Sequence, residues 1–409
     1  MKTTLFALFI TAWLAVPAVI AQRPESGPAS EPLRSMLQAN TMRVATCQAQ
    51  GRAIDWRITQ ASEFLTAVDK NLDALEEIVN RAGRQKCDAL ALPEDTLGLL
   101  HWYGMNEPLA KQVLPDAVDR MLNRLGGAAA KHNMYLVVCS DHIEVDGGTY
   151  NTAFFLGRDG QEIGRYHKTC PTWSEGGSRK SGETFPVFDT PDLGKVGLAI
   201  CYDLVMPETA RCLTLNGADI IFFPTMGGAA IGDDDIEMQS LRVRAAENHV
   251  YLAVAFRGSG SRIISPRGKI LATAEGIDGL AIADIDPRGG REGGDSSNQQ
   301  KDMRSRLFRE RIPAAYSILS ESNPPMLTKV PPLDMSREEA GRIFARMLTV
   351  GDEELQAAQK LISAGKTKDA IAAFEKLRTE YRGTWIDRVA QETLATLRAN
   401  GIQKVTETK

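Results

Sequence analysis

Three short segments each end in a side chain that can take part in covalent chemistry. Cys201 follows the apolar run 196–200, Glu94 follows 91–93, and Lys168 ends the segment 164–168. A cysteine is only a few per cent thiolate near neutral pH, so a cysteine nucleophile needs a neighbouring base and a cation. Taken singly, each residue has an ordinary interpretation: a solvated glutamate at a strand end, a surface lysine and a buried structural cysteine.

The sequence around these residues makes the combination specific. Glu94, Lys168 and Cys201 occur in the order and at the spacing found in the nitrilase superfamily of carbon–nitrogen hydrolases, which the segment 42–286 resembles. The sequence motifs that carry the resemblance are Gly197–Asp203, Pro207-Glu208, Arg211, Arg242, Arg244, Glu247-Asn248 and Ile264–Gly268.

The resemblance implies an α/β fold, a four-layer α-β-β-α sandwich that often forms homodimers. It also implies roles for individual residues. Glu94 would act as general base, Cys201 as nucleophile and Lys168 as oxyanion stabiliser, helped by the backbone N–H of Tyr202. The product of attack would be a thioester, which water then hydrolyses.

Many members of this superfamily have a second glutamate between the lysine and the cysteine. Glu175 is the candidate here, and Glu183 is the alternative, because a second carboxylate can steer the base and the water. The sequence also departs from the family pattern, since Cys170 stands where many members have a histidine. We expect Cys201 to remain reduced despite this second thiol.

The residues after the nucleophile favour one branch of chemistry. Tyr202-Asp203 resembles the amidase and carbamoylase branches, whereas true nitrilases more often have Trp-Glu. We therefore expect hydrolysis of a small amide or N-carbamoyl compound, with nitrile hydrolysis as the alternative. N-acyl transfer to lipoprotein would need several membrane spans, which the sequence lacks. A further alternative is an inactive binding or scaffold protein that uses its C-terminal helices.

The elements that must position these residues alternate between strand-like and helical patterns. Strand-like apolar runs occur near 43–48, 88–93, 135–140, 151–157, 195–200, 219–224 and 251–256, and helical spacing occurs at 59–82, 109–132, 207–216 and 233–248. Alternation of this kind predicts an α/β class, with the catalytic side chains at strand ends. The loops 97–108, 172–184 and 226–235 are expected to form the pocket walls.

The ends of the chain differ from the centre. An apolar run after Lys2, followed by small residues, predicts a signal peptide and an exported, periplasmic or secreted protein without a membrane span after cleavage. A small all-helical extension is predicted after a proline-rich linker, and its segment 370–377 resembles a tetratricopeptide helix. The predicted divisions are 1–21 signal peptide, 22–41 flexible leader, 42–312 hydrolase domain, 313–335 linker and 336–400 helical extension.

Composition excludes some classes of function. The 409 residues are 43% hydrophobic and 24% charged, which is typical of a folded globular protein. A formal net charge of −4 without a block of like charge gives no support for nucleic-acid binding. Neither a metal-ligand cluster nor a dinucleotide-binding glycine motif is present, so we expect no cofactor. The expected partners are a small-molecule substrate, further copies of the chain, and a protein held by the C-terminal helices.

Overall fold

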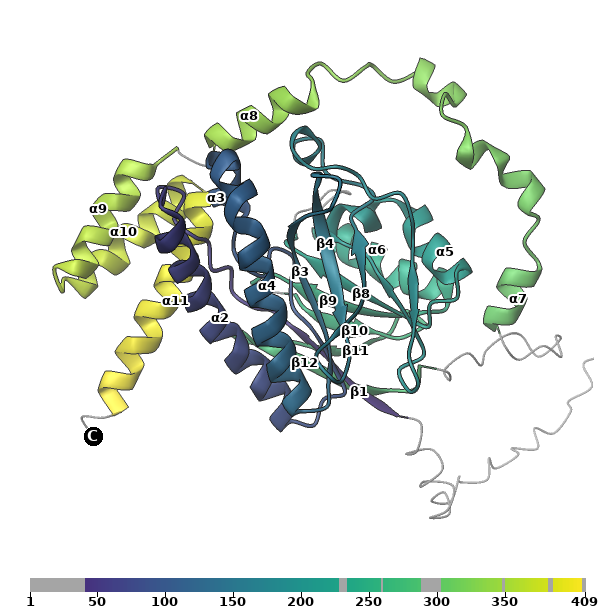
Figure 1. Cartoon of the computed structure of the whole chain (residues 1–409), viewed down its shortest axis with the longest axis horizontal. Helices are drawn as coiled ribbons and strands as arrows, with labels where there is room; N and C mark the ends of the chain where they lie inside the picture. Colours follow the sequence, from purple (N-terminus) through teal and green to yellow (C-terminus); the bar gives the residue numbers. More distant parts are fainter. Residues whose placement is uncertain are drawn as a thin grey trace, which may run out of the picture. The chain divides into compact units, whose positions relative to one another are not determined.

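The computed structural model describes residues 41–227, 234–258, 260–287, 303–347, 350–381 and 385–406. Its centre consists of two six-stranded sheets packed face to face, with helices on both outer faces (Figure 1). The predicted signal peptide and leader lie outside the described residues, as does most of the glycine- and arginine-rich stretch after Pro287.

The first sheet has the strand order β12-β1-β2-β3-β4-β5. Its strands are β1 (Met42–Cys47), β2 (Ala89–Ala91), β3 (Tyr135–Ile143), β4 (Thr149–Leu156), β5 (Glu162–His167) and β12 (Leu280–Ile285). Strands β1, β2 and β3 are parallel, so their carboxyl ends share one edge, where Glu94 follows β2. The outer strands pair antiparallel.

The second sheet repeats this plan with the order β11-β10-β9-β8-β7-β6. Its strands are β6 (Val187–Asp189), β7 (Lys195–Leu198), β8 (Ile220–Thr225), β9 (Tyr251–Phe256), β10 (Arg262–Ile264) and β11 (Ile270–Thr273). Strands β7, β8 and β9 are parallel, and the nucleophile candidate follows β7. Both sheets therefore deliver a candidate side chain from the carboxyl end of a central parallel strand.

Alternation along the strands explains the layers. On β1, Val44 points into the core between the sheets, whereas Ala45 and Cys47 face the helices of the first outer layer. That layer consists of α2 (Ala61–Arg84) and α4 (Glu107–Lys131). The opposite layer consists of α5 (Pro207–Leu215) and α6 (Asp234–Asn248). The predicted four-layer α-β-β-α sandwich is confirmed.

Further helices follow the sandwich. They are α7 (Met303–Arg309), α8 (Arg337–Met347), α9 (Asp352–Ser363), α10 (Thr367–Glu380) and α11 (Trp385–Thr406). Helices α9, α10 and α11 share a small apolar core of their own that includes Leu355, Phe374 and Leu394. The predicted all-helical extension is thus present as helices.

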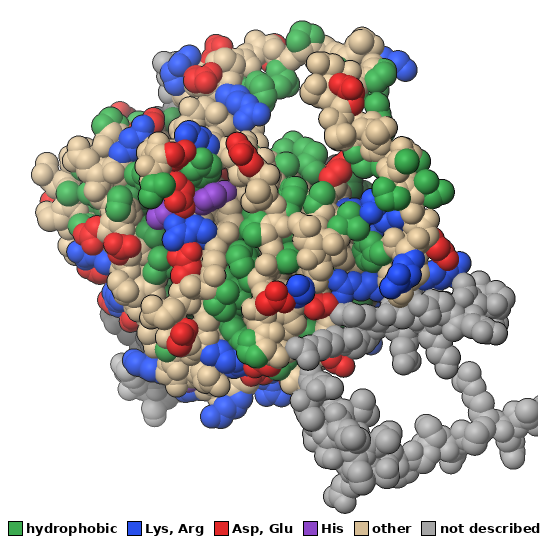
Figure 2. Space-filling model, turned by 45° about the vertical axis from the view of Figure 1, so that its right-hand side comes forward, with side chains coloured by type: hydrophobic (Ala, Val, Ile, Leu, Met, Phe, Trp, Pro, Cys, Tyr) green, Lys and Arg blue, Asp and Glu red, His purple; other side chains and the backbone are tan. Residues whose placement is uncertain are grey.

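The stretch predicted as a linker contains two 3-10 helices, η3 (Pro313–Ser320) and η4 (Pro325–Thr328), rather than irregular chain alone. Nearly all of its side chains are exposed, and several are large and apolar (Figure 2). The exposed apolar residues are Tyr316, Ile318, Leu319, Met326, Leu327, Val330 and Leu333. No helix of the described residues is both long and apolar enough to cross a membrane.

Two predicted pocket loops contain helix. The short helix α3 (Leu100–Met105) lies within 97–108. Its start is stabilised by the Asp95 carboxylate, which accepts hydrogen bonds from the backbone N–H groups of Leu99 and Leu100. The 3-10 turn η1 (Glu175–Gly177) lies within 172–184. Both turns lie near the strand ends that carry the candidate residues.

Candidate active site

Cys201 occupies a strained turn between strand and helix. Strand β7 ends at Leu198, the 3-10 turn η2 (Cys201–Val205) begins at the cysteine, and α5 follows. The backbone φ of Cys201 is +45°, in the left-handed region that costs a residue with a side chain about 1–3 kcal/mol. Such strain persists only where neighbouring contacts hold the turn, and a reactive side chain at a sharp turn is presented away from its own strand.

The contacts that hold this turn converge on Asp203. Its fully buried carboxylate accepts hydrogen bonds from the backbone N–H of Ile200 at 2.8 Å and from the hydroxyl of Tyr166 at 2.8 Å. It also accepts the backbone N–H of Cys170 at 2.8 Å and the hydroxyl of Thr169 at 3.1 Å. One carboxylate therefore ties the turn of the nucleophile candidate to the segment that follows Lys168.

Lys168 lies between two glutamates. Its ammonium donates to Glu94 Oε1 at 3.1 Å and to Glu175 Oε2 at 2.9 Å. Asn151, at the start of β4, donates its side-chain amide to Glu94 at 2.8 Å and to Glu175 at 3.2 Å. The exposed fractions of the Lys168 and Glu94 side chains are only 1% and 4%. A buried ammonium needs such partners, because an unpaired charge in this environment would be very costly.

Backbone groups complete the coordination of both carboxylates. The N–H of Met226, after β8, donates to Glu94 Oε2 at 3.0 Å, and the N–H of Thr172 donates to Glu175 Oε2 at 2.8 Å. The two glutamates thus receive hydrogen bonds from both sheets and from the 172–184 loop. Their orientation is fixed before any substrate arrives.

The electrostatic field of the cluster keeps Lys168 charged. Burial acts to lower the pKa of its ammonium, but the carboxylates of Glu94 and Glu175 outweigh burial and raise that pKa well above its usual value. For Glu175, burial acts to raise the pKa, yet Lys168 and Arg179 lower it to about 2. Lys168 is therefore a permanent cation and Glu175 a permanent anion at neutral pH.

The thiol of Cys201 is protonated at rest. Burial and the nearby carboxylate of Glu94 raise its pKa to about 12, although Lys168 and the hydroxyl of Thr225 act in the opposite direction. A thiol in this state needs a base before it can attack, and the carboxylate of Glu94, which contributes to the raised pKa, is the candidate for that base. All six cysteines lie within the described residues and are unpaired.

The structure brings together three of the residues singled out from sequence, with a fourth electrostatically coupled to them. Glu94, Lys168 and Glu175 form direct contacts, and Cys201 interacts with each of their charges. Glu183 is exposed and makes no contact with Lys168, so Glu175 is the second carboxylate of the cluster. The backbone of Tyr202 lies in η2, immediately after the cysteine.

Sequence reasoning missed Asn151 and the bridging role of Asp203. Asn151 lies in β4 between Thr149 and Thr152, so its polar side chain does not stand out in that part of the strand. Asp203 belongs to the sequence motif around Cys201. Its bridging role becomes visible only in the structure, where Tyr166 and Thr169 donate hydrogen bonds to its carboxylate.

Other residues that carry the family resemblance make structural contacts. Arg211 donates to the backbone carbonyl of Glu247 at 2.9 Å, which joins α5 to α6. Arg242 donates to the carbonyl of Gly268 at 2.8 Å, and Arg244 forms an ion pair with Glu247 at 3.2 Å. These contacts fasten the helices that support the nucleophile turn.

A cavity of about 20 Å³ opens beside the two glutamates. Its wall includes Asn151, Arg179 and Met226, and Arg179 is held by a bidentate ion pair with the buried Asp141 at 2.6 Å. This space admits little more than one water-sized group. Within the described residues, no group of three or more histidine, cysteine, aspartate or glutamate side chains is arranged to hold a metal ion.

Comparisons with known proteins identify the family. The profile of the family described as carbon-nitrogen hydrolase matches residues 43–292. The chain is 32% identical over 243 residues to the deaminated glutathione amidase of Synechocystis sp., covering 53% of this chain and 86% of the relative. It is 27% identical over 239 residues to the omega-amidase of Mus musculus, covering 53% and 83%.

Solved structures share the fold. A variant of the amidase from Nesterenkonia sp. AN1, with the acetamide moiety of fluoroacetamide added covalently at its active-site cysteine, superposes with a TM-score of 0.50 at 25% identity, covering 66% of this chain and 97% of that one. The C. elegans NitFhit protein gives 0.54 at 23% identity, covering 68% and 66%. The matched segment contains Glu94, Lys168, Glu175 and Cys201. The chain belongs to the carbon–nitrogen hydrolase family.

Proposed function

We propose that the protein hydrolyses the C–N bond of a small amide through a thioester on Cys201. The observation that carries this proposal is the buried ammonium of Lys168, held between Glu94 and Glu175 beside the strained cysteine turn. The family membership and the amidase relatives support amide over nitrile as the substrate. An N-carbamoyl group presents the same carbonyl and nitrogen to the site, so it belongs to the same proposal.

In the first step, the Cys201 thiol gives its proton to the Glu94 carboxylate, and the sulfur forms a bond to the carbonyl carbon. Protonation removes the negative charge that raises the pKa of the thiol, so attack and proton transfer assist one another. The total charge of the cluster does not change, since the negative charge moves from oxygen to sulfur and then to the substrate oxygen.

The oxyanion that forms would accept hydrogen bonds from the Lys168 ammonium and the backbone N–H of Tyr202. A preorganised donor of this kind typically lowers the barrier by about 3–4 kcal/mol. Glu94 then returns its proton to the leaving nitrogen as the C–N bond breaks, which releases ammonia or an amine. Water, deprotonated by Glu94, attacks the thioester to release the acid and restore the thiol.

Glu175 acts in this scheme as a positioning residue. Its carboxylate holds the ammonium of Lys168 and the amide of Asn151, and the low pKa of about 2 keeps it from competing for the proton.

The test compares Cys201→Ala with Cys170→Ala, a second partly buried thiol in the same region. Ammonia release is measured from a panel of primary amides and N-carbamoyl amino acids, and the acyl-enzyme is sought by intact-protein mass spectrometry after rapid acid quenching. We expect Cys201→Ala to lose at least about 10³-fold in kcat and all acyl adduct, while Cys170→Ala keeps both. Equal activity of the two variants would remove the cysteine mechanism.

Three wider properties are part of the same proposal. Export after signal cleavage follows from the apolar run near the amino terminus. Assembly into homodimers follows from the family resemblance. A protein partner for the C-terminal helices, in which the segment 370–377 resembles a tetratricopeptide helix, would be recognised outside the hydrolytic site.

A further inference from the structure

The candidate base and the candidate nucleophile come from different sheets. Glu94 follows β2 of the first sheet, and Cys201 follows β7 of the second. Proton transfer between them requires the strand ends of the two sheets to keep a fixed separation, because a displacement of about 1 Å can slow such a step about 100-fold. Side chains that cross from one sheet to the other beside these residues can set that separation.

Two buried arginine–aspartate pairs flank the two glutamates. Arg179 pairs with Asp141 at 2.6 Å, and the exposed fraction of each side chain is 7%. Arg257 pairs with Asp95 at 3.0 Å, with exposed fractions of 6% and 10%. A buried ion pair adds little net stability, because removing two charges from water costs about as much free energy as their attraction returns. The two pairs are therefore candidates for fixing geometry.

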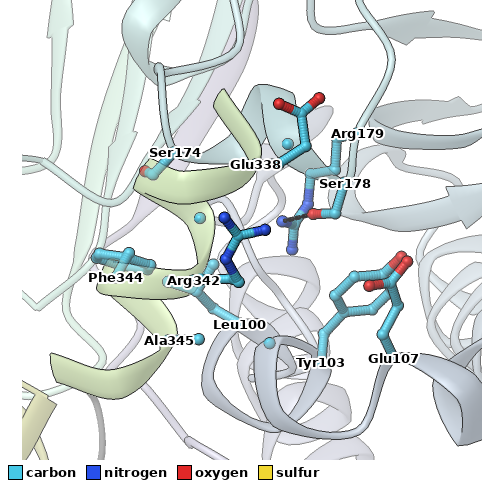
Figure 3. A pocket seen from close by; sticks show the side chains of 13 residues that line it. Leu100, Tyr103, Glu107, Ser174, Ser178, Arg179, Glu338, Arg342, Phe344 and Ala345 are labelled. Atoms are coloured by element: carbon cyan, nitrogen blue, oxygen red, sulfur yellow. Dashed lines mark hydrogen bonds between the residues drawn. The ribbon is translucent and has the colours of Figure 1, made fainter. Parts of the chain in front are cut away.

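The Arg179 pair holds the turn that carries Glu175 and does not reach a strand of the second sheet. Its aspartate lies in β3, and Arg179 lies in the loop that follows β5. Helix α8 packs on the same turn, where Trp173 donates its indole N–H to the carbonyl of Met335 at 3.2 Å and the Arg337 guanidinium lies 4.8 Å above the indole ring. Arg179 and α8 line one cavity of about 310 Å³ (Figure 3).

The Arg257 pair joins the two sheets. Arg257 follows β9 in the second sheet, and its side chain reaches the turn after β2 in the first. The guanidinium donates one hydrogen bond to Asp95 Oδ2 at 3.0 Å and another to the Asp95 backbone carbonyl at 3.0 Å. The side chain and the backbone of the residue after Glu94 are thus held by one planar fork of donors, which a lysine does not possess.

Asp95 adopts a backbone conformation that needs this support. Its φ is +53°, in the left-handed region that residues with a side chain rarely adopt. Burial raises the pKa of its carboxyl group, and the charge of Arg257 acts in the opposite direction, so the guanidinium helps to keep the group ionised. Since Glu94 is the preceding residue, a change in the backbone of Asp95 would redirect the Glu94 side chain.

The backbone of Arg257 is tied to the other side of the site. Its N–H donates to the carbonyl of Thr225, the last residue of β8, at 3.0 Å. The hydroxyl of Thr225 acts on the Cys201 thiol, and the N–H of Met226 donates to Glu94 Oε2 at 3.0 Å. Arg257 therefore connects the strand end that contacts both reacting groups to the turn that carries the base.

We propose that Arg257 is a positioning residue, which keeps the Glu94 carboxylate aligned with the Cys201 thiol by clamping the Asp95 turn of the first sheet to the end of β8 in the second. This inference rests on the proposed function, because it assigns a further residue to the same reaction. The guanidinium is bonded to the protein and does not line the small cavity at the glutamates. Its loss should therefore slow the chemical step more than it weakens substrate binding.

The test compares Arg257→Gln with Arg304→Gln. Arg304 on α7 is a matched control, because it also donates to a carboxylate, that of Asp219 at 2.6 Å, and to a backbone carbonyl, that of Ala218 at 2.5 Å. It does so at the opposite end of β8. For each variant, kcat and KM are measured with the primary amide that the unaltered protein hydrolyses fastest, and urea unfolding gives the stability.

We expect Arg257→Gln to lower kcat about 50-fold and to leave KM within about threefold. Arg257→Lys, which keeps the charge without the fork, should recover part of kcat. Arg304→Gln should keep kcat within about twofold at a similar loss of stability. Equal losses of kcat in the two glutamine variants, a loss confined to KM, or an unchanged kcat in Arg257→Gln would overturn the assignment.

A double variant tests whether the clamp acts as a unit. Asp95→Asn removes the other partner of Arg257, so Asp95→Asn/Arg257→Gln should be no slower than the slower of the two single variants. Multiplication of the two separate losses in the double variant would contradict a shared role.

Alkylation of Cys201 by iodoacetamide separates this inference from the proposed hydrolysis, because it needs no turnover. Displacement of the Glu94 carboxylate should move the midpoint of the alkylation–pH profile to lower pH by about 0.5 in Arg257→Gln, and Arg304→Gln should leave it unchanged. Loss of the positive charge alone would move the midpoint to higher pH, so the direction identifies displacement of Glu94. A shift to higher pH would overturn the assignment.

The two measurements fail independently. Absence of amide hydrolysis in the unaltered protein together with the shift to lower pH would remove the reaction and keep the clamp. Hydrolysis that requires Cys201, with the same kcat and the same alkylation midpoint in Arg257→Gln as in the unaltered protein, would keep the reaction and remove the clamp.

Discussion

Charged side chains at the centre of the sandwich and those on helix α8 are held in different ways. Lys168 is buried and contacts two carboxylates, and Glu94 accepts hydrogen bonds from three groups. Arg342 on α8 is exposed and has no partner within the described residues. The comparison separates two environments. The buried charges beside the candidate nucleophile are fixed in advance by their partners, whereas an exposed charge at the surface leaves its hydrogen bonds available to water.

The largest effect on turnover is expected from Glu94→Gln, in the buried cluster of Glu94, Lys168 and Glu175. We expect kcat for amide hydrolysis to fall about 10³-fold, because the proton acceptor is lost. Burial and the negative charge of Glu94 together raise the Cys201 pKa to about 12, so removal of that charge should lower the pKa in part. The thiolate fraction at pH 8 to 9 would then increase, and alkylation by iodoacetamide would become faster while turnover becomes slower.

The measurement is the alkylation rate of the Cys201 peptide against pH, read by mass spectrometry so that the other thiols are resolved. Glu183→Gln is the matched control, because it neutralises an exposed carboxylate in the neighbouring loop. Retention of turnover within tenfold, or slower alkylation, would contradict the view that Glu94 is the base and that its charge contributes to the raised Cys201 pKa.

Asp203→Asn tests the contact that joins the cysteine turn to the Lys168 segment. The amide cannot accept hydrogen bonds from all four donors that the carboxylate serves, and one buried donor left unpaired costs about 1–3 kcal/mol. We expect kcat to fall about thirtyfold and the free energy of unfolding to fall by about 2 kcal/mol. Urea unfolding and steady-state kinetics give the two values; a change in stability with unaltered kcat would make Asp203 purely structural.

Gly177→Ala tests whether the contact between α8 and the turn that carries Glu175 matters for turnover. The added Cβ would meet the Arg337 backbone at 2.6 Å, whereas a Cβ on Gly176 would meet the movable end of the Arg337 side chain. We expect Gly177→Ala to lower kcat/KM about tenfold through displacement of α8 or of the Glu175 turn, and Gly176→Ala to lower it less. Steady-state kinetics gives kcat/KM for both variants. Equal losses would show that the contact between α8 and the Glu175 turn is not involved.

The smallest effect on turnover is expected from Phe374→Ala, in the core shared by α9, α10 and α11. This fully buried phenylalanine belongs to a cluster separate from the three cores of the sandwich, so its loss should cost about 4 kcal/mol locally. We expect an earlier unfolding step by circular dichroism and a kcat within about twofold of the unaltered protein. A parallel loss of turnover would couple the helical core to the site.

How far the sequence predicts the molecule also differs between these regions. The sandwich and the positions of Glu94, Lys168 and Cys201 can be predicted from the sequence. The apolar strand patterns and the motifs that flank these residues each lie within a short stretch of the chain. The choice of Glu175 over Glu183 depends on the 3-10 turn that brings one of them to Lys168. The bridging role of Asn151 and the approach of α8 to that turn are contacts between distant segments, and no local pattern encodes them.

The tether between the sandwich and α8 has a consequence for how the chain tolerates changes in its length. Residues 313–335 are exposed along nearly their whole length and make few contacts of their own, so changes there should cost little stability. Insertions or deletions in this stretch should therefore leave the buried cluster of Glu94, Lys168 and Glu175 intact. The contact between the start of α8 and the turn of Glu175 is the one that such changes would alter first.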